Sequence, residues 1–179
     1  MKLIIGLGNI GDKYAKNRHN AGFMFVDYLS WEWNSRMETK WHLDKYMDAE
    51  IFLLKRDEKE YVFAKPQSYM NKSGEAARQL LKKYALSPSD LIVAHDDLDV
   101  QLGKSKIQLG TGPKVHNGIL SIESSIKSSD FMRVRIGVDN RNGDRSMPGE
   151  AYVLQNFKPE EQNILDEVFV SLASRPELK

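Results

Sequence analysis

Four consecutive apolar residues, Leu91 to Ala94, constrain the fold more than any other stretch of this chain. A strand with one face in water alternates apolar and polar residues, whereas a strand buried on both faces is an unbroken apolar run. Strands of the second kind lie inside sheets that helices cover on both sides. The run therefore predicts an α/β protein with this strand at the centre of its sheet.

The remaining chain alternates between strand and helix patterns, as an α/β fold requires. Ser73 or Asn71 is a candidate N-cap for the second helix, and Pro159 is suited to open the last one. The chain contains no repeat, linker or low-complexity segment, so residues 1–179 are expected to form a single domain with helices on both faces of the sheet. Strands are predicted at residues 2–7, 49–55, 60–64, 91–94, 104–109 and 132–138, and helices at residues 20–34, 75–81, 119–126 and from Pro159 to Phe169.

The composition excludes several classes of protein. No apolar run approaches the roughly 18 residues that a membrane span needs. The short N-terminal apolar run is followed by Asp12 and Lys13, unlike a signal peptide. The chain has no cysteine, which excludes disulfide bonds and a thiol nucleophile. We therefore expect a cytoplasmic protein without a membrane partner.

The stretch from Gly6 to Gly11 matches the GxGxxG fingerprint of dinucleotide-binding proteins. In such a site a helix starts inside the motif and directs its N-terminus at a pyrophosphate. Here the next residues are polar, and no helical pattern begins before His19. The acidic residue expected at the end of a second strand is also missing, since Asp27 falls within the first helix. We interpret the stretch as a catalytic loop that carries Asn9 and His19.

Similar polar side chains follow several of the predicted strands. Asn9 follows the first strand, Asn71 follows the hairpin, Asp96 follows the central strand, and Asn117 follows the strand after that. Each asparagine alone could be a turn or cap residue. If the strands are parallel, however, their carboxyl ends meet at one edge of the sheet, where α/β proteins bind ligands. The pattern predicts a cleft there, with His19 beside it.

These residue types suit the hydrolysis of an ester by water. Asparagine amides offer uncharged donors and acceptors for an ester or a developing oxyanion. A neutral histidine oriented by an aspartate is a common general base. There is no GxSxG elbow for a serine nucleophile, no P-loop, and no metal-ligand spacing among the histidines. Asp96, Asp97 and Asp99 could hold Mg²⁺, but a solvated strand end is the better explanation for two of the three.

Positive charge is concentrated in residues 104–145. This segment carries eight Lys or Arg and four Asp or Glu residues, although the whole chain has a net charge of only +1. A local excess of cations is the footprint that a phosphate backbone requires. The alternative explanation is that the segment is an ordinary solvated surface, on which the excess of positive charge arose by chance.

Five motifs occur in order along the chain. They are Gly6-Leu7-Gly8-Asn9 with Arg18-His19-Asn20-Ala21-Gly22, Tyr69-Met70-Asn71-Lys72-Ser73-Gly74, His95-Asp96-Asp97-Leu98-Asp99, His116-Asn117-Gly118 and Arg135-Ile136-Gly137. Together they resemble the bacterial peptidyl-tRNA hydrolase family. The resemblance implies a mixed, mostly parallel twisted sheet, a monomer, and cleavage of the ester between the peptide and the 3′ end of tRNA, without cofactor or metal.

The resemblance also implies roles for individual residues. His19 would be the base that activates water, and Asp96 would be its partner. The other positions would bind the peptidyl-tRNA, including its acceptor stem and 3′ end. Asn9, Asn71 and Asn117 would contact the peptide and the terminal adenosine, and Tyr14 and Met70 would shape the cleft. Lys106 and Arg135 would contact the tRNA backbone.

The chain departs from the family pattern at three places. Ile10 stands where proline is usual, Gln108 stands where a basic residue is common, and residues 111–115 replace a loop of mostly small residues. Fewer glycines restrict the backbone of that loop. A second hypothesis is therefore a non-catalytic RNA-binding relative, since a chloroplast intron-splicing factor has the same fold.

Overall fold

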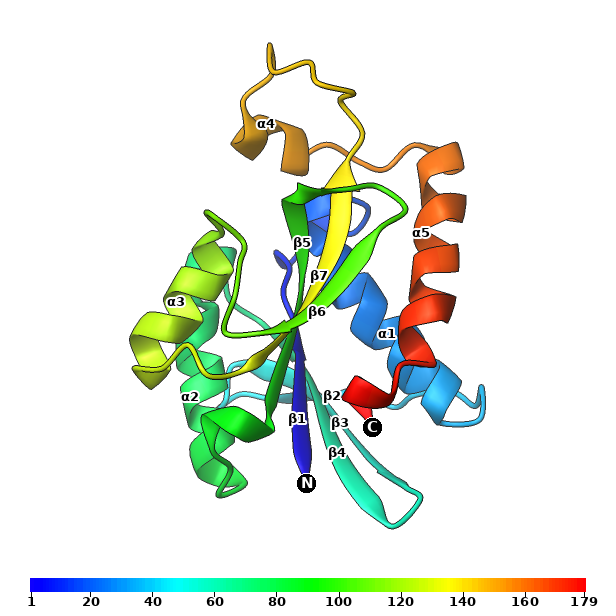
Figure 1. The fold of residues 1–179 in the computed structure, drawn as a ribbon. Coiled ribbons are helices and arrows are strands. Elements are labelled where there is room, and N and C mark those ends of the chain that lie inside the picture. The colour runs from blue at the N-terminus through cyan, green and yellow to red at the C-terminus, as the bar shows by residue number, and fades with distance from the viewer.

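The computed structural model describes all 179 residues and contains one seven-stranded sheet between two layers of helices (Figure 1). The strand order is β2-β3-β4-β1-β5-β7-β6. The strands are β1 (Lys2–Gly6), β2 (His42–Asp44), β3 (Ala49–Arg56), β4 (Lys59–Pro66), β5 (Leu91–Gln101), β6 (Ser105–Leu109) and β7 (Met132–Asp139), and the α-helices are α1 (Ala21–Trp33), α2 (Ser73–Lys83), α3 (Asn117–Ile126), α4 (Gly149–Val153) and α5 (Pro159–Ala173).

The sheet is mixed, and its four central strands are parallel. β1 pairs in parallel with β4 and β5, and β5 pairs in parallel with β7. The antiparallel pairs lie outside this block, where β3 joins β4, β2 joins β3, and β6 joins β7. The predicted α/β fold is confirmed, including the hairpin of β3 and β4.

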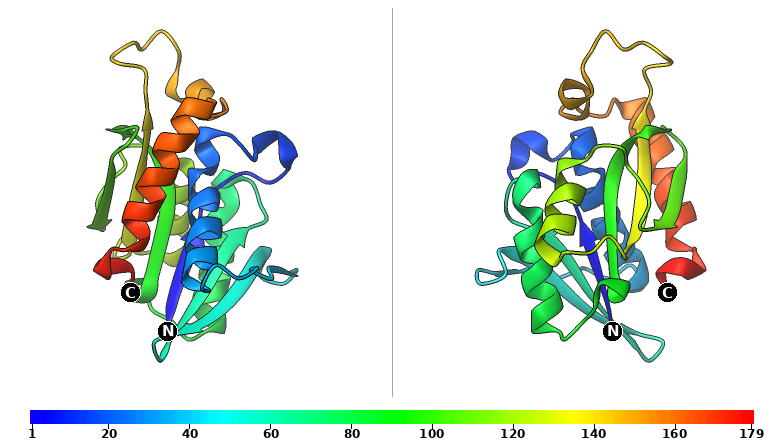
Figure 2. Two further views of the ribbon diagram at one scale, coloured as in Figure 1. Left: turned by 90° about the vertical axis from the view of Figure 1, so that its right-hand side faces the viewer. Right: turned by 60° about the vertical axis from the view of Figure 1, so that its left-hand side comes forward.

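Each face of the sheet has its own apolar core. On one face α1 and α5 pack with residues such as Phe25, Leu29 and Phe169. On the other face α2 and α3 pack with residues such as Leu80 and Ile122. Figure 2 shows these two helix pairs on opposite sides of the strands. No helix combines the length and the apolar character that crossing a membrane demands.

The central strand is longer than the sequence pattern predicts. β5 continues past Ala94 to Gln101, so Asp96 and Asp97 lie within the strand and not after it. Their carboxylates are buried because each has a cationic or hydrogen-bonding partner. β1 accompanies β5 only as far as the pair Gly6 and Ala94, whereas β7 continues beside Asp97. The outer half of β5 is therefore open on the β1 side.

One prediction about the helices was wrong. Neither Ser73 nor Asn71 caps α2, because the helix begins at Ser73 and has no side-chain cap. The sequence pattern did not predict α4, which is too short to show a periodic pattern.

The glycines near the N-terminus permit close packing of α1 on the sheet. A Cβ atom on Gly22 would lie 2.3 Å from the carbonyl oxygen of Ala94, and one on Gly6 would lie 2.4 Å from the carbonyl oxygen of Gly22. α1 begins at Ala21, well after Gly11, which agrees with rejecting a dinucleotide site. The close approach brings the start of α1 against β5.

Candidate active site

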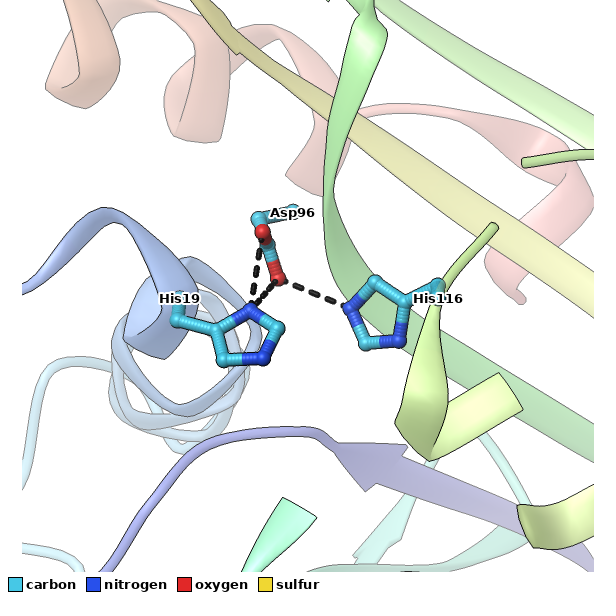
Figure 3. Close-up of side chains that lie close together, drawn as sticks. All are labelled: His19, Asp96 and His116. Atoms are coloured by element: carbon cyan, nitrogen blue, oxygen red, sulfur yellow. Dashed lines mark hydrogen bonds and ion pairs between the residues drawn. The ribbon is translucent and has the colours of Figure 1, made fainter. Parts of the chain in front are cut away.

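A buried carboxylate lies between two histidines at the open half of β5 (Figure 3). The Nδ1 atom of His19 lies 2.9 Å from Oδ1 and 3.0 Å from Oδ2 of Asp96. The Nε2 atom of His116 lies 2.9 Å from the same Oδ1. His19 comes from the 3-10 turn η2 (Arg18–Asn20), Asp96 from β5, and His116 from the N-cap of α3.

The hydrogen bonds of His116 define its protonation. Its Nδ1 accepts from the backbone N–H groups of Gly118 and Ile119, at 3.1 and 3.3 Å. An accepting nitrogen carries no proton, so the proton of the neutral ring is on Nε2, which donates to Asp96. His116 thus caps α3 and fixes the carboxylate at the same time.

His19 is the more accessible of the two histidines, with 14% of its side chain exposed. Its Nδ1–H donates to the carboxylate, and its Nε2 has no partner within the protein. Burial favours the neutral ring, but the Coulombic attraction and hydrogen bond of Asp96 outweigh burial and raise the pKa of His19. The neutral form therefore presents a lone pair of increased basicity to the cleft.

The charge state of the surrounding groups is set by burial and by these contacts. Burial would raise the pKa of Asp96, but His19 and His116 override it and hold the pKa well below its usual range. His95 is fully buried, and burial together with the neighbouring His116 lowers its pKa to about 3. Asp96 is thus held as a carboxylate, and His95 is held as a neutral imidazole.

Three asparagines lie around the histidine and are not used as helix caps. Asn9 accepts the backbone N–H of Met70 through Oδ1 at 3.0 Å, which leaves its Nδ2 donor free. Asn71 and Asn117 are exposed side chains that line the same cleft as Asn9. Their amides and His19 therefore face one space.

That space is a cleft of about 340 Å³ lined by both polar and apolar residues. Gly149, Glu150, Val153 and Leu154 form the part of the lining that α4 and its C-cap contribute, which we call the α4 wall. The lining comprises Asn9, His19, Tyr69, Met70, Asn71, Asp96, Asp97, Leu98, Pro113, Val115, His116, Asn117, Gly149, Glu150, Val153 and Leu154.

The loop of residues 111–115, unusual for the family, is held in place by two contacts. Arg133 donates to the carbonyl oxygen of Gly112, and the N–H of Lys114 donates to Asp99 at 3.0 Å. Pro113 and Val115 then form part of the cleft wall. The side chains of Pro113 and Val115 thus line the cleft together with Asn117.

The structure does not bring every predicted site residue to the cleft. Met70 is buried in the lining, but Tyr14 lies outside it, on the 3-10 turn Asp12–Tyr14 under the ammonium group of Lys13. Lys106 is exposed on β6. Arg135 is only 7% exposed.

Most cations of the basic segment, residues 104–145, are already paired with acidic side chains, so fewer of them can bind an anion than the net charge indicates. The guanidinium of Arg135 donates to Asp97 and Gln108, both at 2.6 Å. Arg133 is paired with Glu123, while Arg141 and Arg145 share Asp139. Lys104, Lys106 and Lys127 have no such partner and remain the free cations of the segment.

The cluster of His19, Asp96 and His116 contains residue types that bind metals, and its ligand atoms lie within 4.8 Å of one another. Both nitrogens of His116 and the Nδ1 of His19 are already engaged in hydrogen bonds. A hydrogen-bonded network therefore accounts for the cluster without an ion. The expectation that no metal or cofactor takes part stays a prediction.

Sequence reasoning missed His116 and the α4 wall as parts of the site. The signal for His116 was its place in the motif His116-Asn117-Gly118, but that motif drew attention to Asn117, and an isolated histidine has many explanations. The residues of α4 carry no chemical signal at all. Both are recognised from their position in space.

A histidine oriented by a buried carboxylate, in an amide-lined cleft at the carboxyl edge of an α/β sheet, defines an enzyme of the hydrolase class. The model of the peptidyl-tRNA hydrolase family matches residues 3–177. The chain belongs to this family.

The similarity to individual members extends over nearly the whole chain. The peptidyl-tRNA hydrolase of Mycobacterium avium is 41% identical over 176 residues, which cover 98% of this chain and 89% of that protein. The corresponding enzyme of Mycolicibacterium vanbaalenii is 38% identical over 98% of this chain and 88% of its own length. The crystal structure of peptidyl-tRNA hydrolase from Acinetobacter baumannii has a TM-score of 0.86 at 30% identity and covers 97% of this chain and 85% of that one.

Proposed function

We propose that this protein hydrolyses the ester bond between the peptide and the tRNA in peptidyl-tRNA, with His19 as the general base. One observation carries the mechanism: the Nδ1 of His19 is bound to the buried Asp96, while its Nε2 is open to the cleft. Membership of the family supports the choice of substrate.

The reaction starts when Nε2 of His19 accepts a proton from a water molecule. The water oxygen forms a bond to the ester carbonyl carbon, and the carbonyl oxygen becomes an oxyanion. The bond from that carbon to the ribose oxygen then breaks. The ribose oxygen takes the proton from the His19 imidazolium, which releases the tRNA with a free 3′ end. The peptide leaves as a carboxylic acid, which keeps the second hydrogen of the water and then loses it to solvent as the carboxylate forms.

The asparagines supply the uncharged hydrogen bonds that this sequence of steps needs. The free Nδ2 of Asn9 and the exposed amides of Asn71 and Asn117 can bind the peptide backbone and the developing oxyanion. The carboxylate of Asp96 stabilises the imidazolium while the intermediate exists. The cleft is complete within one chain, which is consistent with action as a monomer.

The pH dependence of hydrolysis should follow the ionisation of His19. Only the unprotonated ring can act as base, and Asp96 raises the pKa of this ring above its ordinary value of 6.5. We therefore expect kcat/KM to rise with pH through a single acidic limb whose midpoint lies above 6.5. Steady-state rates from about pH 5 to about pH 9 test this. A midpoint below 6.5 would contradict the assignment of the base.

Lys106 is the better candidate for a tRNA phosphate contact, because Arg135 is occupied by Asp97 and Gln108. We expect Lys106→Ala to weaken tRNA binding uniformly and to reduce the salt slope by about 0.9 per lost phosphate contact. Binding measured at several salt concentrations checks this, with Lys45→Ala as control for a cation outside the basic segment. An equal loss in both variants would indicate that only net charge matters.

Incubation with N-acetyl-aminoacyl-tRNA tests the proposed activity directly. Release of N-acetyl amino acid with intact tRNA is the expected result. Binding of the tRNA without cleavage would instead support the non-catalytic RNA-binding relative. The pairing of His19 with Asp96 favours the enzyme, because a binding protein needs no open base beside a buried carboxylate.

A further inference from the structure

The 3-10 turn that carries His19 holds three separate parts of the molecule through three consecutive residues. His19 binds Asp96 on β5. The side chain of Asn20 brackets the backbone of Asn9, accepting its N–H and donating to its carbonyl oxygen, both at 2.9 Å. Arg18 extends to the C-terminal part of the chain.

Arg18 is 3% exposed and makes a dense set of contacts with residues 152–161. Its Nη2 donates to Oε2 of Glu161 at 2.6 Å. Its Nη1 donates to the carbonyl oxygens of Asn156 and Gln155, at 2.8 and 3.3 Å. The guanidinium also lies over the ring of Tyr152, 4.4 Å from its centroid.

Glu161 is equally buried and joins further segments to Arg18. Its Oε2 accepts the N–H of Lys158 at 2.8 Å and thereby caps the start of α5. Its Oε1 accepts from the amide of Asn140, directly after β7, at 3.0 Å. The carboxylate of Glu161 therefore connects the end of β7 and the start of α5 to the turn that carries His19.

The carbonyl groups that Arg18 binds belong to the two residues that follow the α4 wall in the sequence. Val153 and Leu154 line the cleft, and Gln155 and Asn156 are the next two residues. Arg18 thus directly precedes the base in the sequence and binds the backbone just beyond the α4 wall. A shift of its guanidinium would act on both.

We propose that Arg18, clamped by Glu161, is a positioning residue that sets the distance from His19 to Asp96 and to the α4 wall. The proposal rests on the proposed function, in which His19 is the base. Buried ion pairs are an inefficient source of stability, because desolvation cancels much of their attraction. The pair is thus better explained by the geometry that it enforces than by its energy.

Three variants separate positioning from stability. Arg18→Met and Glu161→Gln each leave one buried charge without its counterion, so both should lower Tm. The double variant Arg18→Met/Glu161→Gln has no unpaired charge and should regain much of that loss. It should still show a kcat about 10- to 100-fold below the unmodified protein and a raised KM, because the carbonyls of Gln155 and Asn156 are no longer held.

A matched control removes an ion pair elsewhere. Lys83 and Asp44 lie 2.6 Å apart between α2 and β2, outside the cleft lining. The variant Asp44→Asn/Lys83→Met should keep its kcat and KM. A double variant of Arg18 and Glu161 that regains Tm and also has unchanged kcat and KM would overturn the proposal.

The titration of His19 followed by NMR gives a readout that does not need activity. The charged or titratable groups that line the cleft with this ring are Tyr69, Asp96 and Asp97 of β5, His116 before α3, and Glu150 of α4. If the ring loosens from Asp96 in the double variant, its pKa should fall toward its ordinary value. An unchanged pKa would contradict positioning, even if the unmodified protein cleaved no ester and the proposed function itself failed.

Discussion

Replacing His19 by alanine should lower kcat for N-acetyl-aminoacyl-tRNA hydrolysis by about 10²- to 10⁴-fold, the usual contribution of a general base. The variant retains the asparagines, so substrate should still bind and KM should change little. The residual rate would come from positioning of the ester by the cleft. Single-turnover cleavage by the variant, followed by gel separation of charged and free tRNA, measures the effect.

The control for this substitution is His42→Ala. His42 is an exposed histidine on the edge strand β2, outside the cleft, and its loss should leave kcat unchanged. The tRNA affinity of His19→Ala, measured by filter binding, should stay close to that of the unmodified protein. Retention of more than about a tenth of the original kcat would contradict the role of His19 as base, since a lost base costs at least about 100-fold.

Replacing Asp96 by asparagine should lower kcat/KM by a similar factor of about 10²- to 10⁴-fold. An amide has a donor and an acceptor where the carboxylate has two acceptors. When its Nδ2–H₂ group faces His19, the Nδ1 of the ring must accept, and the proton moves to Nε2. The ring then has no lone pair for water. The volume of the side chain stays the same, so the fold should be retained.

Two measurements distinguish this effect from a general loss of structure. The ¹⁵N chemical shifts of His19 should show a change from the Nδ1–H to the Nε2–H tautomer in Asp96→Asn. The residual kcat/KM of this variant should rise with pH at a lower midpoint than that of the unmodified protein, because the carboxylate that raises the pKa of His19 is gone. Asp90→Asn removes a carboxylate just before the same strand and should leave both properties unchanged. An unaltered tautomer with full activity would refute the partnership of Asp96 and His19.

The positions of most strands could be predicted from the sequence, but the end of β5 could not. A pattern of apolar residues marks where a strand is buried, and Leu91 to Ala94 marked one of the interior strands of the sheet correctly. The same pattern suggested that the strand stops at His95, because charged residues are usually solvated. β5 continues because Asp96 and Asp97 find buried partners from distant segments, and such partners are invisible in a local window of sequence.

The convergence of the asparagines was predicted for a reason that is only partly correct. Asn9 and Asn71 reach the same edge because β1 and β4 are parallel. Asn117 follows β6, which is antiparallel to β7, so strand direction alone would have placed it at the other edge. The loop of residues 110–116 carries the chain back, and the N-terminus of α3 then places Asn117 in the cleft.

The sequence by itself determined the fold class, the motifs of the family, and the gathering of polar side chains at strand ends. These follow from residue types and local spacing, which a single chain displays directly. The partnership of His19 and Asp96 was implied only by the resemblance to the family. Only the tertiary structure decided that His116 orients Asp96, that Arg135 is bound by Asp97 and Gln108, and that Arg18 joins His19 to the α4 wall. A long polar side chain can face solvent, a ligand or another buried group, and only the packing of distant segments around it selects among these.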